Sequence, residues 1–218
     1  MIAHVNGIDL YYEKSGAGRP LVMVHGNSED HTIFNEAAAV LSERFTVFCP
    51  DSRGHGQSTP VSEFHYTDMA ADMIAFLEEL DLNDVVFYGF SDGGIIGLLA
   101  AAKCDRITTL ITSGANLTPN GAKPVLRLIA RVLYLFTKDP KMTLMLREPW
   151  IGDDILHSIK AKTLVLAGSK DLVTEKETRA IAAGIPGAKL CILKGEGHGS
   201  YIVHKTKIAE LILDFVKE

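Results

Sequence analysis

The sequence predicts an α/β protein in which a mostly parallel, doubly wound sheet carries helices on both faces. Short apolar segments alternate along the 218 residues with segments whose apolar residues recur at helical spacing. Several of the short segments lack alternating polar residues, as expected for strands that are buried on both faces. Because parallel strands need a long crossover connection, which is usually a helix, this alternation favours a parallel sheet.

Each expected element rests on its own pattern of apolar residues and turn residues. Strands are expected at residues 2–6, 8–13, 21–24, 45–49, 84–90, 163–167 and 189–193. Helices are expected at about residues 32–43, 67–80, 95–103, 175–183 and 206–216. In the segment 67–80, for example, the apolar residues Met69, Met73, Phe76 and Leu80 recur at intervals of three and four. That spacing places them on one face of a helix.

The alternation is interrupted between about residues 115 and 158. Two apolar-rich helices, expected at 125–136 and 140–147, follow one another there without a strand between them. We therefore expect a short helical cap inserted over the sheet of a single domain that spans residues 1–218. A chain of this length can bury one sizeable core.

Composition and charge exclude several classes of function. The net charge of −5 and the lack of a cationic cluster argue against a nucleic-acid partner. The most basic stretch, 123–131, has three cations among apolar residues and is typical of the wet side of an amphipathic helix. The three cysteines are widely spaced without a C-x-x-C pair, so neither a zinc site nor a disulfide framework is expected.

The chain also lacks the sequence patterns of export and membrane insertion. Its first residues do not combine a cationic start with an apolar core, and no apolar run approaches the length of a membrane span. We therefore expect a cytoplasmic protein that acts on a small molecule and has no membrane partner. No metal and no organic cofactor is expected, and the oligomeric state stays open.

The strongest motif is Gly89-Phe90-Ser91-Asp92-Gly93, which fits G-x-S-x-G. It lies between an expected strand and an expected helix, which is the context this motif requires. A nucleophile on so tight a turn needs neighbours without side chains, and the following helix directs free N–H groups towards developing negative charge. The alternative is a glycine-rich turn that carries an unimportant serine.

Two further residues make Ser91 a candidate nucleophile rather than a turn residue. Asp171 comes just after the expected strand 163–167, and His198 lies in the glycine-rich loop after the strand 189–193. The carboxyl ends of parallel strands meet at one edge of a sheet, so these residues can gather there with Ser91. Their order along the chain, Ser, Asp, His, is that of a triad on this kind of sheet. The alternatives are a helix cap for Asp171 and a surface histidine for His198.

An oxyanion hole is expected from the backbone N–H groups of Asn27 and Asp92. Asn27 follows His25 and Gly26 at the end of the first parallel strand, where the chain can turn towards Ser91. The Asn27 side chain could add a third donor, although a turn-forming asparagine explains it equally. We expect His25 to be a buried structural residue.

The segment Asp51-Ser-Arg53-Gly-His55-Gly-Gln-Ser58 contains several charged and polar residues. A catalytic or metal-binding role is one interpretation. His55 and His31 are too scattered to suggest a ligand set, however, and we expect Asp51 and Arg53 to brace a loop together.

Taken in order, H-G-N, D-x-R-G-H-G-x-S, G-x-S-x-G-G, G-x-x-D and G-H-G resemble the α/β-hydrolase superfamily over almost the whole chain. This resemblance implies a triad of Ser91, Asp171 and His198, an oxyanion hole near Asn27 and Asp92, and a cap over the site. The string 89–94 is similar to that of the valacyclovirase-like (biphenyl-hydrolase-like) esterases, which hydrolyse amino-acid esters. The chain departs from the common pattern in its short cap and in the acidic residue after the nucleophile.

We therefore expect a serine hydrolase that cleaves a small carboxylic ester, thioester or lactone through an acyl-enzyme intermediate. Asp92 could attract a cationic substrate, or its side chain could brace the turn by hydrogen bonding. Tyr134 and Trp150 lie near an apolar cap and are candidates for substrate contact.

Other functions use the same residues. A C–C bond hydrolase and a cofactor-free perhydrolase both use this triad. From another class, the fold also serves as a small-molecule receptor that retains its triad.

Overall fold

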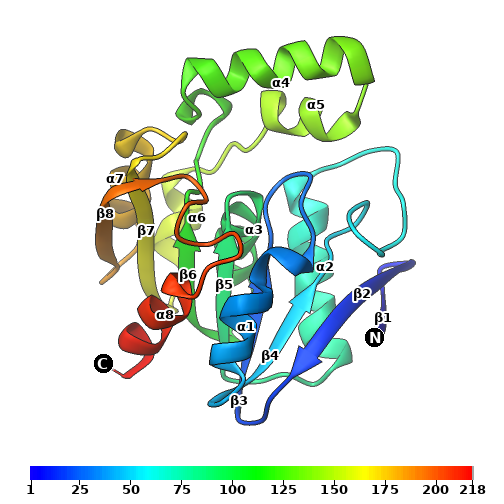
Figure 1. Ribbon diagram of the computed structural model, residues 1–218, viewed down its shortest axis with the longest axis vertical. Coiled ribbons are helices and arrows are strands. Elements are labelled where there is room, and N and C mark those ends of the chain that lie inside the picture. The colour runs from blue at the N-terminus through cyan, green and yellow to red at the C-terminus, as the bar shows by residue number, and fades with distance from the viewer. Residues whose placement is uncertain (218) are drawn as a thin grey trace.

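The computed structural model describes residues 1–217, and its centre is an eight-stranded sheet with helices on both faces (Figure 1). This arrangement confirms the predicted fold class. Across the sheet the strands lie in the order β1-β2-β4-β3-β5-β6-β7-β8. Their bounds are β1 (Ile2–Val5), β2 (Ile8–Ser15), β3 (Arg19–Val24), β4 (Phe45–Pro50), β5 (Val85–Phe90), β6 (Ile107–Ser113), β7 (Lys162–Lys170) and β8 (Lys189–Gly197). Strand β2 pairs antiparallel with β1 and β4, and all the other pairs are parallel.

The helices connect these strands and cover the sheet. They are η1 (His31–Phe34), α1 (Asn35–Leu41), α2 (Tyr66–Glu79), α3 (Asp92–Ala101), η2 (Pro119–Gly121), α4 (Pro124–Thr137), α5 (Pro140–Arg147), α6 (Asp153–Ser158), α7 (Glu175–Gly184) and α8 (Lys207–Lys217). Helices α1 and α8 cover one face, and α2, α3, α6 and α7 cover the other. The expected strands and helices therefore lie where the sequence places them, to within a few residues.

Alternate residues of the central strands supply two separate cores. In β3, Leu21 and Met23 pack with α1 and α8, whereas Val22 and Val24 pack with α2 and α3. Successive side chains of a strand point to opposite faces, so a strand between two helical layers must be apolar throughout. All four of these residues are fully buried, which explains why the runs show no polar alternation.

Besides the short η2 turn, one strand and one α-helix were not expected from the sequence. Strand β6 pairs with both β5 and β7. Its buried residues include Thr109, Thr112 and Ser113, so the segment lacks the continuous apolar run by which the other parallel strands were predicted. Helix α6 packs against α3 and α7 on the sheet and is not part of the layer formed by α4 and α5.

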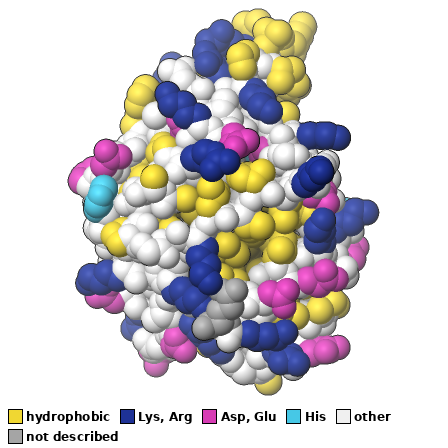
Figure 2. All heavy atoms as spheres, turned by 90° about the vertical axis from the view of Figure 1, so that its left-hand side faces the viewer, with side chains coloured by type: hydrophobic (Ala, Val, Ile, Leu, Met, Phe, Trp, Pro, Cys, Tyr) yellow, Lys and Arg dark blue, Asp and Glu magenta, His cyan; other side chains and the backbone are white. Residues whose placement is uncertain are grey.

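The segment between β6 and β7 places α4 and α5 above the carboxyl ends of the parallel strands, at the top of Figure 1. These two helices pack on each other and cover the edge at which Ser91 lies. Hydrophobic side chains are exposed at the same end of the molecule (Figure 2). None of the helices within residues 1–217 is long and apolar enough to cross a membrane.

Candidate active site

Ser91 is the single residue between the end of β5 and the start of α3. Its backbone angles, φ 52° and ψ −112°, are disfavoured for a residue with a side chain. Hydrogen bonds hold this conformation, since the Ser91 N–H donates to the Ser113 carbonyl at 2.7 Å and the Gly94 N–H donates to the Ser91 carbonyl at 3.0 Å. The turn therefore presents Ser91 at the carboxyl edge of the sheet.

The two glycines of the motif permit this turn sterically. A Cβ atom on Gly89 would lie 2.0 Å from the Gly93 carbonyl oxygen, and one on Gly93 would lie 2.0 Å from the Val24 carbonyl oxygen. Both contacts are with backbone atoms, which cannot move aside as a flexible side chain could. Strand β5, the turn at Ser91 and strand β3 consequently pack so closely that only glycine fits at positions 89 and 93.

The structure brings Ser91, His198 and Asp171 into one hydrogen-bonded row. Nε2 of His198 lies 3.0 Å from Oγ of Ser91, and Nδ1 of the same ring lies 2.6 Å from Oδ1 of Asp171. Asp171 follows β7 and His198 follows β8, and these strands are parallel neighbours in the sheet. The distances lie within the range in which a hydroxyl can pass its proton to an imidazole.

Asp171 is held as an ionised acceptor. Its side chain is buried, and it accepts the N–H groups of Val173 at 2.9 Å and Gly168 at 3.3 Å in addition to the His198 ring. Burial acts to raise the pKa of Asp171, but the hydrogen bonds and the charge of His198 outweigh it, so the pKa lies below its ordinary value. The carboxylate fixes the proton on Nδ1 and leaves Nε2 free to accept from Ser91.

The His198 ring packs against two residues, Phe90 and Gly114, whose role in the site we did not identify from the sequence. The ring packs against Phe90, with centroids 5.0 Å apart. Gly114 also lies against the ring; its φ is +65°, and a Cβ atom there would come within 2.8 Å of His198 Cε1. Gly114 directly follows β6, so it could have been found only by first identifying that strand.

The backbone N–H groups of Asn27 and Asp92 are both available near Ser91. Within residues 1–217, the Asn27 N–H has no acceptor in the protein. Asp92 is the first residue of α3, where the N–H groups have no carbonyl one turn earlier to bind. The positive end of the helix dipole also lies here, which favours negative charge.

The Asn27 side chain is not a free third donor, contrary to our suggestion from the sequence. Its Nδ2 group donates to Oδ2 of Asp92 at 2.9 Å and approaches the Lys141 carbonyl at 3.4 Å. Oδ1 of Asp92 accepts the Tyr66 hydroxyl at 2.8 Å. Asp92 is only 5% exposed, and this burial raises the pKa of its carboxyl group. The hydrogen bonds from Asn27 and Tyr66 oppose that shift. Both oxygens of Asp92 are thus engaged with the protein.

A cavity of about 260 Å³ opens beside Ser91 and His198. Most of its wall is apolar, and α4 and α5 supply much of it. The lining residues are Asn27, Ser28, Glu29, Phe90, Ser91, Leu126, Ile129, Ala130, Leu133, Met142, Met145, Leu172 and His198. A cavity of this size and polarity suits a small apolar acyl group.

Glu29 adds an acid to this cavity that sequence reasoning missed. One carboxylate oxygen accepts the Gly26 N–H at 3.0 Å, and burial raises the pKa of the group. A Cβ atom on Gly26 would lie 2.7 Å from this oxygen and 3.1 Å from Cβ of Ser91, so the three residues converge closely. The only sequence indication is its position three residues after Gly26, where a side chain can return to cap the turn.

Comparison with known proteins identifies the family. A family model described as alpha/beta hydrolase fold matches residues 19–141, which is more than half of the chain. The chain belongs to the α/β-hydrolase family. A relative in Synechocystis sp. (strain ATCC 27184 / PCC 6803 / Kazusa), named "Putative non-heme chloroperoxidase", is 39% identical over 96% of this chain and 95% of its own.

Solved structures share the fold of this α/β hydrolase over its whole length. The esterase (EaEST) from Exiguobacterium antarcticum matches with a TM-score of 0.87 at 22% identity, covering 100% of this chain and 99% of its own. The enol-lactonase from Burkholderia xenovorans LB400 matches with a TM-score of 0.83 at 21% identity, covering 100% of both chains. At these identities the likeness shows the fold alone.

Neither Tyr134 nor Trp150 is among the residues that line the cavity of this α/β hydrolase. The Tyr134 ring contacts the Lys138 ammonium group, with 5.3 Å between the nitrogen and the ring centroid. Trp150 is 69% exposed, and its indole N–H donates to the Arg147 carbonyl. Tyr134 neighbours the cavity-lining Leu133 on α4 but is not itself one of the lining residues.

Asp51 and Arg53 do not brace a loop together, as we expected, but belong to two separate networks of this α/β hydrolase. Arg53 forms a bidentate ion pair with the buried Asp72, in which Nε lies 2.5 Å from Oδ2 and Nη2 lies 2.7 Å from Oδ1. Asp51 instead accepts the backbone N–H and the ring Nδ1 of His31, each at 2.8 Å. The two residues lie close in sequence but point to different partners because the chain turns between them.

His25 and His55 are buried neighbours, with 5.1 Å between their ring centroids. His25 donates from Nδ1 to the Gly26 carbonyl and accepts the Ser52 N–H on Nε2, so both ring nitrogens are used by a neutral imidazole. Burial lowers the pKa of His25, and it lowers that of His55 to about 4. These contacts fit the structural role that we expected for His25.

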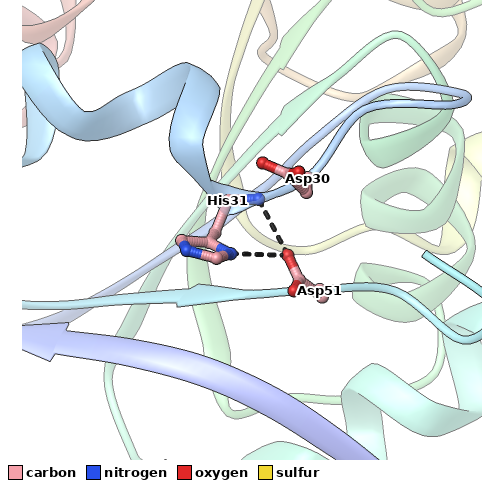
Figure 3. A group of neighbouring side chains, drawn as sticks. All are labelled: Asp30, His31 and Asp51. Carbon is pink, nitrogen blue, oxygen red and sulfur yellow. Dashed lines mark hydrogen bonds and ion pairs between the residues drawn. The ribbon is translucent and has the colours of Figure 1, made fainter. Parts of the chain in front are cut away.

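Asp30, His31 and Asp51 form a cluster close to the loop (Figure 3), with one potential ligand atom from each within 4.8 Å of the others. The carboxylates already have donors. Asp30 caps η1 by accepting the Thr32 N–H at 2.9 Å, and Asp51 binds His31 and the Gln57 N–H. The cluster is therefore explained by capping and by attachment of the η1 segment to β4.

Proposed function

We propose that this α/β hydrolase is a serine esterase that cleaves small carboxylic esters, thioesters or lactones through an acyl-enzyme. The observation that carries the proposal is the hydrogen-bonded row of Ser91, His198 and Asp171, with 3.0 Å and 2.6 Å between successive members. Such a row activates a hydroxyl that is otherwise a weak nucleophile.

In the first half-reaction, Ser91 Oγ attacks the acyl carbon while Nε2 of His198 takes the hydroxyl proton. The tetrahedral oxyanion accepts hydrogen bonds from the backbone N–H groups of Asn27 and Asp92. Collapse of this intermediate expels the alkoxide, which receives the proton from His198. Asp171 keeps the ring in the tautomer that accepts from serine and stabilises its protonated form.

In the second half-reaction, His198 removes a proton from water as the water attacks the acyl-serine. The carboxylic acid leaves, and the proton returns to Ser91 Oγ. The acyl group occupies the apolar cavity under α4, whose volume of about 260 Å³ favours short and medium chains.

A second candidate is perhydrolysis, in which hydrogen peroxide replaces water as the acyl acceptor and a peracid leaves. The 39% identical relative is named as a putative non-heme chloroperoxidase, which supports this candidate. The same three side chains would serve, because peroxide enters at the acyl-enzyme stage.

Turnover of p-nitrophenyl esters of increasing acyl length tests the proposal. We expect repeated turnover, a preference for short chains, and a loss of at least about 10³-fold in kcat for Ser91→Ala. Near-wild-type turnover by Ser91→Ala would refute the proposal. Labelling of Ser91 without turnover would favour a receptor, and halide oxidation that depends on acetate and peroxide would favour perhydrolysis.

A further inference from the structure

Helix α4 exposes most of the large hydrophobic side chains found on the surface of this protein. Seven of the ten exposed large hydrophobic residues within 1–217 lie on it. We call Val125, Leu128, Val132, Leu135 and Phe136 the apolar stripe, and they are 43% to 84% exposed. Their spacing of three, four, three and one places them on one side of the helix. Figure 2 shows hydrophobic side chains gathered at this end of the molecule, with Lys and Arg nearby.

Cations follow one edge of the apolar stripe. Arg127 and Arg131 lie four residues apart on one side of α4, and Lys138 directly follows the helix as its C-cap; we call these three residues the basic row. The helix has no acidic residue, although the whole chain has a net charge of −5. The nearest acid in sequence, Asp139, caps α5 and pairs with Lys141 at 3.7 Å.

The apolar surface continues from the stripe into the cavity. Ile129 and Leu133 both line the cavity beside Ser91, and they are 49% and 45% exposed. Leu126 and Ala130, which are less exposed, line it from the inner side of the same helix. One helix therefore forms both the outer apolar ridge and the roof of the cavity.

We propose that α4 docks the protein onto an anionic phospholipid surface, with the apolar stripe among the acyl chains and the basic row against the headgroups. A helix with a wide apolar face and an adjoining cationic row lies in the plane of such an interface. Helix α4 stands at the outer end of the molecule as a ridge (Figure 1), a shape that suits a flat surface. Substrate delivery from that surface into the cavity rests on the proposed function, whereas docking does not.

The charge of α4 favours an anionic lipid surface over a second copy of the chain as its partner. Packing two α4 helices against one another would bring cations close together, because α4 offers no acid to pair with them. An anionic bilayer supplies the missing negative charge along the whole row. The contact proposed is peripheral. It differs from our expectation from the sequence that the protein has no membrane partner, and vesicle binding decides between the two.

Vesicle sedimentation tests the proposal, with Ser91→Ala as the parent so that no lipid is hydrolysed. We expect binding to vesicles of phosphatidylcholine mixed with phosphatidylglycerol, weaker binding to phosphatidylcholine alone, and a decrease with added salt. Changing Arg127, Arg131 and Lys138 to Gln should lower the affinity by about fivefold per residue. Changing Leu128, Leu135 and Phe136 to Ser should lower it by at least about tenfold.

The matched control changes three exposed lysines outside α4, namely Lys103, Lys176 and Lys205, to Gln and should bind as the parent does. Equal binding by all variants, or none by the parent, would overturn the proposal. A dimer seen by light scattering that the stripe variant abolishes, without a change in vesicle binding, would assign α4 to self-association and also overturn it. Failure of the proposed function would appear separately, as no fluorophosphonate labelling of Ser91 in the wild-type protein.

Discussion

Replacing Asp92 with asparagine tests whether this acid braces the oxyanion loop or recognises a cationic substrate. In the structure, one carboxylate oxygen accepts Nδ2 of Asn27 at 2.9 Å and the other accepts the Tyr66 hydroxyl at 2.8 Å. An amide has only one oxygen, so in either orientation one of the two donors faces an NH₂ group. The contact with Asn27 is the one that reaches the proposed oxyanion hole.

The expected magnitude follows from this loss. A part-buried donor left without its charged acceptor costs about 1–3 kcal/mol, so Asp92→Asn should lower the unfolding free energy by that amount. Burying the charge of Asp92 is unfavourable, as its raised pKa indicates, and the uncharged asparagine avoids that penalty. This gain offsets part of the cost. If about 1.4 kcal/mol of the effect reaches the oxyanion donors, kcat/KM falls about tenfold.

The assay compares alanine ethyl ester with ethyl propionate, which differ chiefly in the ammonium group. If Asp92 is a bracing residue, Asp92→Asn lowers kcat/KM for both esters by the same factor. A matched control, Asp105→Asn, removes the same charge from an exposed position and should change neither value. A selective loss for the alanine ester would refute the bracing role and assign Asp92 to recognition of a cation.

Three further predictions concern the histidine loop, acid stability and the cavity. Gly114→Ala places a Cβ atom 2.8 Å from His198 Cε1, so kcat should fall at least about tenfold while the fold, followed by circular dichroism, is retained; unchanged kcat would contradict the geometry. His55 stays neutral in the folded state down to a pKa of about 4, whereas the unfolded chain binds its proton near pH 6.5. The contribution of His55 to the unfolding free energy should therefore fall with decreasing pH between these values, by up to about 3 kcal/mol. His55→Gln should reduce the pH dependence in urea titrations and leave the part that His25 contributes. An equal slope in the variant would show that other groups cause it. Ala130→Leu fills part of the cavity from α4 and should lower kcat/KM for hexanoate relative to acetate esters; an unchanged ratio would place the acyl group elsewhere.

The sequence predicts the triad residues because each lies directly after a strand that can be identified from local pattern. Once β5, β7 and β8 are placed as parallel strands, Ser91, Asp171 and His198 must meet at one edge of the sheet. The expected positions of strands and helices follow for the same reason, since burial on both faces leaves continuous apolar runs.

What could not be predicted depends on which distant segments meet. The pairing of Arg53 with Asp72, rather than with Asp51, needs the position of α2 relative to the loop. The side-chain contact between Asn27 and Asp92 needs the spacing of β3 and α3. Strand β6 was missed because its buried face includes threonine and serine, and Gly114 was missed with it.

Fluorophosphonate labelling, with the labelled residue mapped by mass spectrometry of the digested protein, identifies the nucleophile directly. We predict one label per chain on Ser91, slower labelling in His198→Ala, and none in Ser91→Ala. A label on a different residue, or equal labelling of Ser91→Ala, would contradict the assignment of Ser91 as the nucleophile.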